Sequence, residues 1–412
     1  MLVIKRNGDV EQFNAEKIKI AVGKAMSRTD ESDDKLQDKV VRYVNKNMGN
    51  AEEIVVDDLH KLVEDGLMNA KAFEVAREYI GYRKQHMPDI FRERSNVRPY
   101  EYPELLEHMW AIYDSFWTHR EFSYGADIQD MHVNMKQHER SAIAKTMLAI
   151  STVEVKAVKD YWGRVHERLP KAEVGMVGAA FSSNEVIHLL AYANLLELMG
   201  LNKDFEEVDN IPALKRRLDY LKNSMRGRDG TNKEFVRTLI LFALFTENVS
   251  LFGQFLIMLT MNKERNLLKG IANAVQSTQK EESCHASFGI ALINIIRREN
   301  PDWFDDEMED YVVEMLMESY DAEMGIINWI FEDGEWSYLP KSDIDMFLKD
   351  RYNQSMVSCG FKPVFEVDDE YLSSKFEWFD VESRTTNRID FFNKKSTNYQ
   401  RKNVSISVDD LI

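Results

Sequence analysis

The feature that most constrains the fold is a long apolar run with a carboxylate near its middle. Residues 239–259 read LILFALFTENVSLFGQFLIML, and this run contains Glu247. A carboxylate in such surroundings costs several kcal/mol unless it is protonated, paired or bound to a metal. A membrane span is the competing interpretation, but four polar residues interrupt the run too often for lipid: Glu247, Asn248, Ser250 and Gln254. The sequence therefore predicts a core helix of a large soluble bundle.

Three further helical stretches carry residues that can bind metal. Glu185 and His188, and likewise Glu282 and His285, are three residues apart, so each pair lies on one face of a helix. One such pair alone is equally well explained as a salt bridge, and chance would produce about one in a chain of this composition. The four predicted helices and their candidate ligands are 138–169 with Glu154, 173–199 with Glu185 and His188, 232–261 with Glu247, and 263–298 with Glu282 and His285. Together they have the composition of a ferritin-like bundle that binds two metal ions through carboxylates and imidazoles.

Composition limits the other classes of function. The net charge of -17 argues against a general nucleic-acid surface, because no excess of basic residues is available to neutralise phosphates. Cys284 and Cys359 are the only cysteines, so a disulfide scaffold is not expected. The charged N-terminal sequence MLVIKRNGDVEQF does not have the form of a signal peptide. We therefore expect a mainly helical cytoplasmic protein that binds neither nucleic acid nor membranes.

The N-terminal residues form a different kind of unit. Residues 2–5 and 10–13 are predicted strands around the turn Asn7-Gly8, a strong hairpin signal. Predicted helices follow at 15–26, 33–47, 56–68 and 70–86. We predict a small α+β domain over 1–90, a linker over 91–102, the helical bundle over 103–380 and a flexible polar tail over 381–412.

From residue 103 to the end, the chain resembles the radical-generating small subunit of class I ribonucleotide reductase. The resemblance lies in the order of the six candidate ligands and in aromatic residues around them. It implies that Tyr192 is the oxidisable tyrosine, that Trp117 belongs to the radical-transfer route, and that Glu281 links Trp117 to a metal-bound histidine. It also implies that Tyr399 carries the radical towards a large catalytic subunit, on which the tail docks. Family members usually have Asp where this chain has Glu154 and Glu281.

The first 90 residues resemble the ATP-cone, a regulatory nucleotide-binding domain. The matching sequence is Val3-Ile4-Lys5-Arg6-Asn7-Gly8-Asp9-Val10-Glu11, followed by Phe13-Asn14 and Lys17-Ile18. The resemblance implies a site for ATP or dATP, with Mg²⁺, formed by Lys5, Arg6, Gly8, Glu11, Asn14, Lys17, His60 and Lys84. The basic residues would meet the phosphates, and Gly8 would shape the hairpin. Val56 stands where the family often has Thr.

These resemblances imply a ribonucleoside-diphosphate reductase small subunit, regulated by ATP or dATP through oligomerisation. We expect a homodimer that forms a larger assembly, such as a tetramer, when dATP binds. The metal pair is expected to be dimanganese, with di-iron or manganese/iron as alternatives, since all accept these ligands. Either Tyr192 or the metal pair itself could store the radical. The alternative functions are another dimetal oxidase, a ferroxidase or monooxygenase, and a nucleotide-sensing adaptor with a degenerate metal site.

Overall fold

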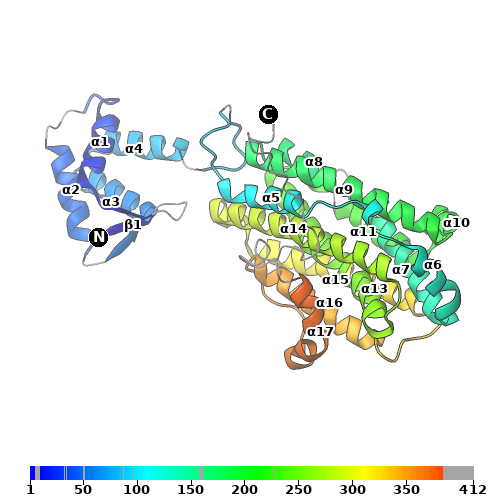
Figure 1. Cartoon of the computed structure of the whole chain (residues 1–412). Coiled ribbons are helices and arrows are strands. Elements are labelled where there is room, and N and C mark those ends of the chain that lie inside the picture. Colours follow the sequence, from blue (N-terminus) through cyan, green and yellow to red (C-terminus); the bar gives the residue numbers. More distant parts are fainter. Residues whose placement is uncertain are drawn as a thin grey trace, which may run out of the picture. The chain divides into compact units, whose positions relative to one another are not determined.

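The computed structural model describes residues 1–4, 10–31, 33, 35–49, 52–86, 88–94, 96–156, 161–224 and 226–383. It divides into two compact units, Met1–Asp89 and Ile90–Ile412. The predicted mainly helical fold is confirmed in both, and Figure 1 labels their helices.

The first unit combines a small sheet with helices. Its described elements are β1 Leu2–Ile4, β2 Val10–Gln12, α1 Ala15–Met26, α2 Leu36–Asn47, β3 Glu53–Val55, α3 Val56–Asn69 and α4 Phe73–His86. The strand order is β2-β1-β3: β1 pairs antiparallel with β2 and parallel with β3. Sequence analysis predicted the first two strands and missed β3, which is three residues long and adjoins a helix. The predicted turn Asn7-Gly8 lies outside the described residues.

The helices of the first unit pack around a core of their own. Asn14 caps α1, because its side chain accepts a hydrogen bond from the backbone N–H of Glu16 at 2.9 Å. Apolar residues one and two turns apart, such as Ile18, Val22 and Ala25, are buried from α1 into this core. The core leaves the charged faces of the helices outside.

The second unit is a bundle of long helices. Its main described helices are α5 Leu106–Asp114, α6 Gly125–Gln129, α7 Gln137–Lys156, α8 Tyr161–Arg164, α9 Ala172–Leu198, α10 Asn202–Glu206, α11 Pro212–Ser224, α12 Asn232–Ile240, α13 Phe252–Arg265, α14 Lys269–Glu299, α15 Asp306–Ile330, α16 Lys341–Ser358 and α17 Asp369–Ser383. Two π-helices, η3 Asp130–Asn134 and η7 Leu241–Ser250, lie among them, together with short 3₁₀ helices η1 Pro103–Leu105, η2 His119–Glu121, η4 Val165–Glu167, η5 Val208–Asn210, η6 Arg226–Asp229 and η8 Pro301–Trp303. Helix α7 packs on α9, α9 on α14, and α14 on η7; Figure 1 labels the three α-helices of this set.

One long predicted helix is interrupted, and another is described only in part. Of the helix predicted over 138–169, the structure describes α7 up to Lys156 and α8 from Tyr161 to Arg164, while residues 157–160 lie outside the described residues. The helix predicted over 232–261 contains the ten-residue π-helix η7 between α12 and α13. Because the run around η7 is apolar on every side, its pattern has no phase that distinguishes a π-helix from an α-helix.

Distant residues hold the N-terminus of α14. Residue Leu268, which precedes the helix, has no capping side chain of its own. Asp127 of α6 instead accepts hydrogen bonds from the backbone N–H groups of Gly270, at 3.1 Å, and Ile271, at 2.7 Å. These bonds satisfy amides that every helix N-terminus leaves unpaired. They fix the start of the helix that carries Glu282 and His285.

The other end of α14 holds the beginning of the second unit. Glu299, its last residue, accepts hydrogen bonds from the backbone N–H of Ile90, at 2.9 Å, and from the hydroxyl of Tyr102, at 2.7 Å. Ile90 and Tyr102 are buried. The residues that the sequence marks as a linker are thus attached to the bundle near both of their ends.

Two helical stretches are long and apolar enough to cross a membrane. They are 172–198, and 232–265 with η7 inside it; 50% and 94% of their most apolar windows are buried within the protein. Glu185, His188 and Glu247 lie on these stretches. Their burial agrees with the core helices expected from the sequence.

Candidate metal centre

The six predicted metal ligands converge in the interior of the bundle. Glu154 comes from α7, Glu185 and His188 from α9, Glu247 from η7, and Glu282 and His285 from α14. They form two groups, each with ligand atoms within 4.8 Å of one another: Glu154, Glu185, His188 and Glu282, and Glu185, Glu247, Glu282 and His285. Glu185 and Glu282 belong to both groups. The arrangement is that of two adjoining candidate sites that share two carboxylates.

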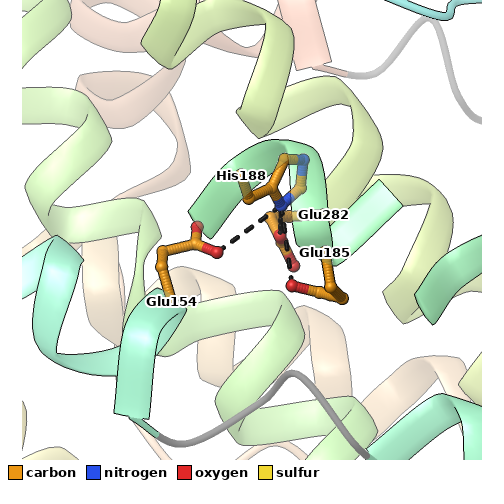
Figure 2. A group of neighbouring side chains, drawn as sticks. All are labelled: Glu154, Glu185, His188 and Glu282. Carbon is orange, nitrogen blue, oxygen red and sulfur yellow. Dashed lines mark ion pairs between the residues drawn. The ribbon is translucent and has the colours of Figure 1, made fainter. Parts of the chain in front are cut away.

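Both imidazoles turn Nδ1 towards the carboxylates. Nδ1 of His188 is 2.9 Å from Oε1 of Glu282 and 3.5 Å from Oε2 of Glu154, as Figure 2 shows for the first group. Nδ1 of His285 is 3.1 Å from Oε1 of Glu185. The six side chains are at most 1% exposed. Nitrogen and oxygen donors therefore face a common, dry centre.

The donor atoms fit two divalent cations. Within the described part of the chain, both carboxylate oxygens of Glu154, Glu185 and Glu282 have no hydrogen-bond partner, and neither does Nδ1 of either histidine. Burial raises the pKa of Glu154 to about 8 even though the charge of His188 opposes this shift, and burial likewise raises the pKa of Glu247. Four carboxylates are thus crowded together without enough positive charge. Two dications would balance them, and carboxylate with imidazole suits manganese and iron.

A hydrogen-bonded chain leads from His188 away from the centre. The indole Nε1–H of Trp117 donates to Oε2 of Glu281 at 2.7 Å, and Nε2 of His188 lies 2.8 Å from the same oxygen. Since Nδ1 of His188 faces the carboxylates, Nε2 is the nitrogen that donates to Glu281. The Trp117 and His188 rings are 6.3 Å apart and inclined by 29°. The resemblance implied a link from Trp117 through Glu281 to a metal-bound histidine, and in the structure that histidine is His188.

Tyr192 lies one helical turn beyond His188 and is buried. Its hydroxyl has no hydrogen-bond partner in the described part of the molecule. Burial, followed by the charge of Glu154, raises the pKa of Tyr192 well above its usual value. The phenol is held in its neutral form beside the metal ligands.

A second tryptophan, which the sequence did not predict, lies at the centre. The indole Nε1–H of Trp162, on α8, donates to Oε1 of Glu247 at 2.9 Å. No spacing in the sequence connects the two residues, which are 85 positions apart. An indole in a core usually only packs, so only the fold could reveal this contact.

The predicted nucleotide residues are only partly described. Lys5, Arg6 and Gly8 lie outside the described residues, as does the side chain of Lys84 on α4. Nζ of Lys17 is 2.8 Å from Oε1 of Glu11, and Asn14 caps the helix that carries Lys17. His60 lies on α3, with Nδ1 2.8 Å from the hydroxyl of Tyr79. The structure thus pairs Glu11 with Lys17 and His60 with Tyr79.

A cavity of about 290 Å³ lies beside these residues in the first unit. Its lining is Lys17, Ile20, Ala21, Lys24, Ala25, Arg28, Tyr79 and Tyr82. The guanidinium of Arg28 lies 5.1 Å from the ring centre of Tyr82. Three cations around an apolar and aromatic floor suit an anionic ligand with a flat ring. The sequence signal was the recurrence of Lys17, Lys24 and Arg28 along one side of α1 and its end.

The C-terminal prediction cannot be placed, because Tyr399 and the tail from residue 384 lie outside the described residues. Cys284 is a buried free thiol between two ligands. Burial raises the pKa of this thiol to about 12, which fits a packing role.

Comparison with known proteins identifies the family. Residues 94–371 match the family Ribonucleotide reductase, small chain, and residues 1–87 match the ATP cone domain. A probable ribonucleoside-diphosphate reductase small subunit from Invertebrate iridescent virus 3 is 20% identical over 332 residues, covering 77% of this chain and 87% of that protein.

Solved structures share the fold of a large part of the chain. A putative class I ribonucleotide reductase from Bacillus halodurans has a TM-score of 0.60 at 16% identity, covering 66% of this chain and 99% of that one. The dimanganese(II) form of NrdF from Streptococcus sanguinis has a TM-score of 0.59 at 15% identity, covering 68% and 96%. The predicted resemblance is confirmed: this chain belongs to the ribonucleotide reductase small chain family and carries an ATP cone at its N-terminus.

Proposed function

We propose that this chain is the cytoplasmic, radical-generating subunit of a class I ribonucleoside-diphosphate reductase. The observation that carries the proposal is the buried set of six ligands with the Trp117–Glu281–His188 chain leading away from it. A site that only stored or oxidised metal would need the ligands but not the hydrogen bonds from His188 through Glu281 to Trp117. The ligands are Glu154, Glu185, His188, Glu247, Glu282 and His285.

Two metal ions, which we infer to be manganese, would supply a strong one-electron oxidant at this centre. Iron or a mixed pair is the alternative, because the same donors accept both metals. As a small subunit with an ATP cone, this chain resembles a subgroup of the family that uses two manganese ions, which favours manganese. The similar fold of a dimanganese protein is consistent with this choice. The protein excludes water from this centre, since its ligands are fully buried.

Trp117 is the first relay residue on the route out of the centre. When Trp117 gives up an electron, its indole N–H becomes more acidic, and Oε2 of Glu281 is 2.7 Å away to accept the proton. The proton thus stays within one hydrogen bond of the ring and can return when the electron does. Tyr192 is the alternative storage site for the oxidising equivalent, and Tyr399 is the relay towards the partner.

The partner is the large catalytic subunit, which would bind the C-terminal tail and the ribonucleotide. The tail ends Val408-Asp409-Asp410-Leu411-Ile412, an acidic and apolar sequence suited to a peptide groove. The small subunit itself then has no need of a substrate site.

The cone would bind ATP or dATP with Mg²⁺. Lys5, Arg6, Lys17 and Lys84 are the proposed phosphate ligands, Gly8 shapes the hairpin, and Glu11, Asn14 and His60 contact other polar groups of the nucleotide. The cavity beside Lys17 supports an anionic ligand in this unit, because Lys24 and Arg28 also line it.

Self-association would connect nucleotide binding to activity. Helices α5 and α9 pack side by side within the subunit, and both carry exposed apolar side chains: Trp110 and Tyr113 on α5, and Val186 and Leu190 on α9. These side chains support a homodimer that forms through the two helices. Binding of dATP would convert this dimer into a larger assembly that cannot dock productively on the large subunit. Sedimentation velocity of the full chain with dATP and with ATP tests this; an unchanged sedimentation coefficient with dATP would contradict it.

One assay separates the proposal from its rivals. The metal-loaded protein is mixed with a matching large subunit, and reduction of CDP is measured. Turnover that needs both proteins supports the reductase, whereas Fe²⁺ oxidation or substrate hydroxylation without the large subunit would identify a ferroxidase or monooxygenase. Electron paramagnetic resonance of the loaded protein distinguishes a tyrosyl radical from a mixed-valent manganese pair.

A further inference from the structure

The two halves of the metal centre have different outer hydrogen bonds. In the His188 half, the imidazole Nε2 pairs with Glu281, which in turn accepts from Trp117. In the His285 half, Nε2 of the imidazole has no hydrogen-bond partner within the described part of the chain. The outer hydrogen bond on this side goes to a carboxylate ligand instead, from Trp162 to Glu247.

The space for Trp162 is made by glycines on the two ligand helices. A Cβ atom on Gly178 of α9 would overlap the backbone carbonyl oxygen of Trp162. A Cβ atom on Gly289 of α14 would overlap Ala243 and would lie 3.1 Å from Cη2 of the Trp162 ring. Helix α9 therefore approaches the backbone of Trp162 closely, and α14 approaches its indole ring, because neither glycine carries a Cβ atom.

Aromatic rings fix the orientation of the indole. Phe181, Phe242 and Phe288 surround it with ring centres 5.5 to 5.7 Å away and ring planes inclined by 60 to 88°. Trp162 is 1% exposed. The N–H is thus aimed at Glu247 by packing on several sides.

The chemistry of the group that accepts its hydrogen bond argues against a radical-relay role for Trp162. Glu281 is outside both ligand groups, so it can take a proton from Trp117 while the metal ligands stay intact. Glu247 is inside a ligand group, and a proton arriving on its Oε1 would weaken it as a ligand. A fixed hydrogen bond from Trp162 instead occupies Oε1, while Oε2 lies 3.7 Å from Nδ1 of His285.

We propose that Trp162 is a positioning residue of the metal centre, whose indole N–H holds Oε1 of Glu247 and so keeps Oε2 on the side of His285, where the two residues would hold a metal ion together. This inference rests on the proposed two-metal site. Glu247 needs such support because it lies in the π-helix η7, while the ligands of α9 and α14 lie on regular α-helices. Outer hydrogen bonds of this kind typically change metal affinity about 10- to 100-fold.

Two substitutions separate the hydrogen bond from packing. Trp162→Phe keeps an aromatic ring and removes the N–H. Trp162→His loses the benzo ring but retains a five-membered ring, whose Nε2–H stands at the same topological position as the indole N–H. A packing role predicts that Phe is tolerated better than His, and a positioning role predicts the reverse.

The experiment measures Mn²⁺ binding to the full chain by calorimetry, together with the electron paramagnetic resonance spectrum of the Mn²⁺-loaded protein. We expect Trp162→Phe to weaken binding of one of two Mn²⁺ ions by about 10-fold or more and to alter the spectrum of the pair. Trp162→His should bind this ion more tightly than Trp162→Phe. Trp336→Phe is the control, because Trp336 is equally buried and its Nε1 has no partner among the described residues.

The outcomes are distinct. If Trp162→Phe binds two Mn²⁺ ions with unchanged affinity, or more tightly than Trp162→His, the positioning role is wrong while the metal centre stands. If the unmodified chain binds neither Mn²⁺ nor Fe²⁺, the proposed metal centre is wrong and the positioning role fails with it.

Discussion

The two units hold their functional polar residues in opposite ways. In the bundle, six ligands from four separate helices are buried, with their donor atoms directed at one another. In the cone, the ion pair between Glu11 and Lys17 is local in sequence, and these side chains are 31% and 61% exposed. A buried charge demands partners, whereas an exposed one is satisfied by water. The bundle should therefore respond to single substitutions severely, and the cone mildly.

The largest effect is expected at a shared ligand. Replacing Glu282 with Ala removes a donor from both ligand groups, so we expect loss of both metal ions and of CDP reduction. Elemental analysis measures the metal, and calorimetry with dATP should show unchanged binding to the cone. Glu264→Ala is the control, because Glu264 is an exposed glutamate on α13 paired with Lys263. Two metal ions retained by Glu282→Ala would show that the groups are not sites.

Next in size is a substitution that spares the metal. Trp117→Phe removes the N–H that donates to Glu281 and replaces the indole by a ring that is harder to oxidise. We expect CDP reduction with the large subunit to fall to background while both metal ions stay bound. Trp336→Phe again serves as the control. If Trp117→Phe reduced CDP at nearly the rate of the unmodified protein, Trp117 would not be part of the radical-transfer route.

The two units can be compared directly by breaking one ion pair in each and measuring the stability of the protein. Arg217 is fully buried in the bundle, 3.3 Å from Oε2 of Glu323 and 3.1 Å from the backbone oxygen of Ser250. Arg217→Met leaves Glu323 buried without its charged partner and should lower the free energy of unfolding by about 3–5 kcal/mol. Lys39→Met breaks the exposed cone pair with Asp33 and should leave the melting temperature unchanged. If Arg217→Met and Lys39→Met shifted the denaturant unfolding curves equally, the proposed difference between the buried and the exposed ion pairs would be wrong.

The smallest effect is expected in the cone itself. Lys17→Ala removes one cation from the cavity and from the proposed phosphate ligands. A hydrogen bond to a charged group contributes about 1.5–3 kcal/mol, so dATP binding should weaken at least about 10-fold. Metal content should not change. Lys46→Ala, at the end of α2 and outside the cavity lining, is the control in the same calorimetric titration.

The same contrast explains what the sequence could reveal. Glu247 inside an apolar run, and two pairs of Glu and His at helical spacing, indicated a common buried centre because two metal ions would satisfy all of these groups together. Trp117 and Glu281 came only from family resemblance. Trp162 and the π-helix η7 left no signal, since an indole in a core and an all-round apolar helix fit many arrangements. In the cone, exposed charges such as Lys24 and Arg28 became candidates only when the fold placed them around a cavity.

Helix α14 has a mechanical consequence for the whole chain. Its last residue, Glu299, holds the backbone of Ile90, where the polypeptide leaves the first unit, and Glu282 lies seventeen residues earlier on the same helix. At about 1.5 Å per residue the two carboxylates are separated by about 25 Å of continuous rod. A pull on the backbone at Ile90 would therefore act on the C-terminal end of the same unbroken helix that carries Glu282 and His285.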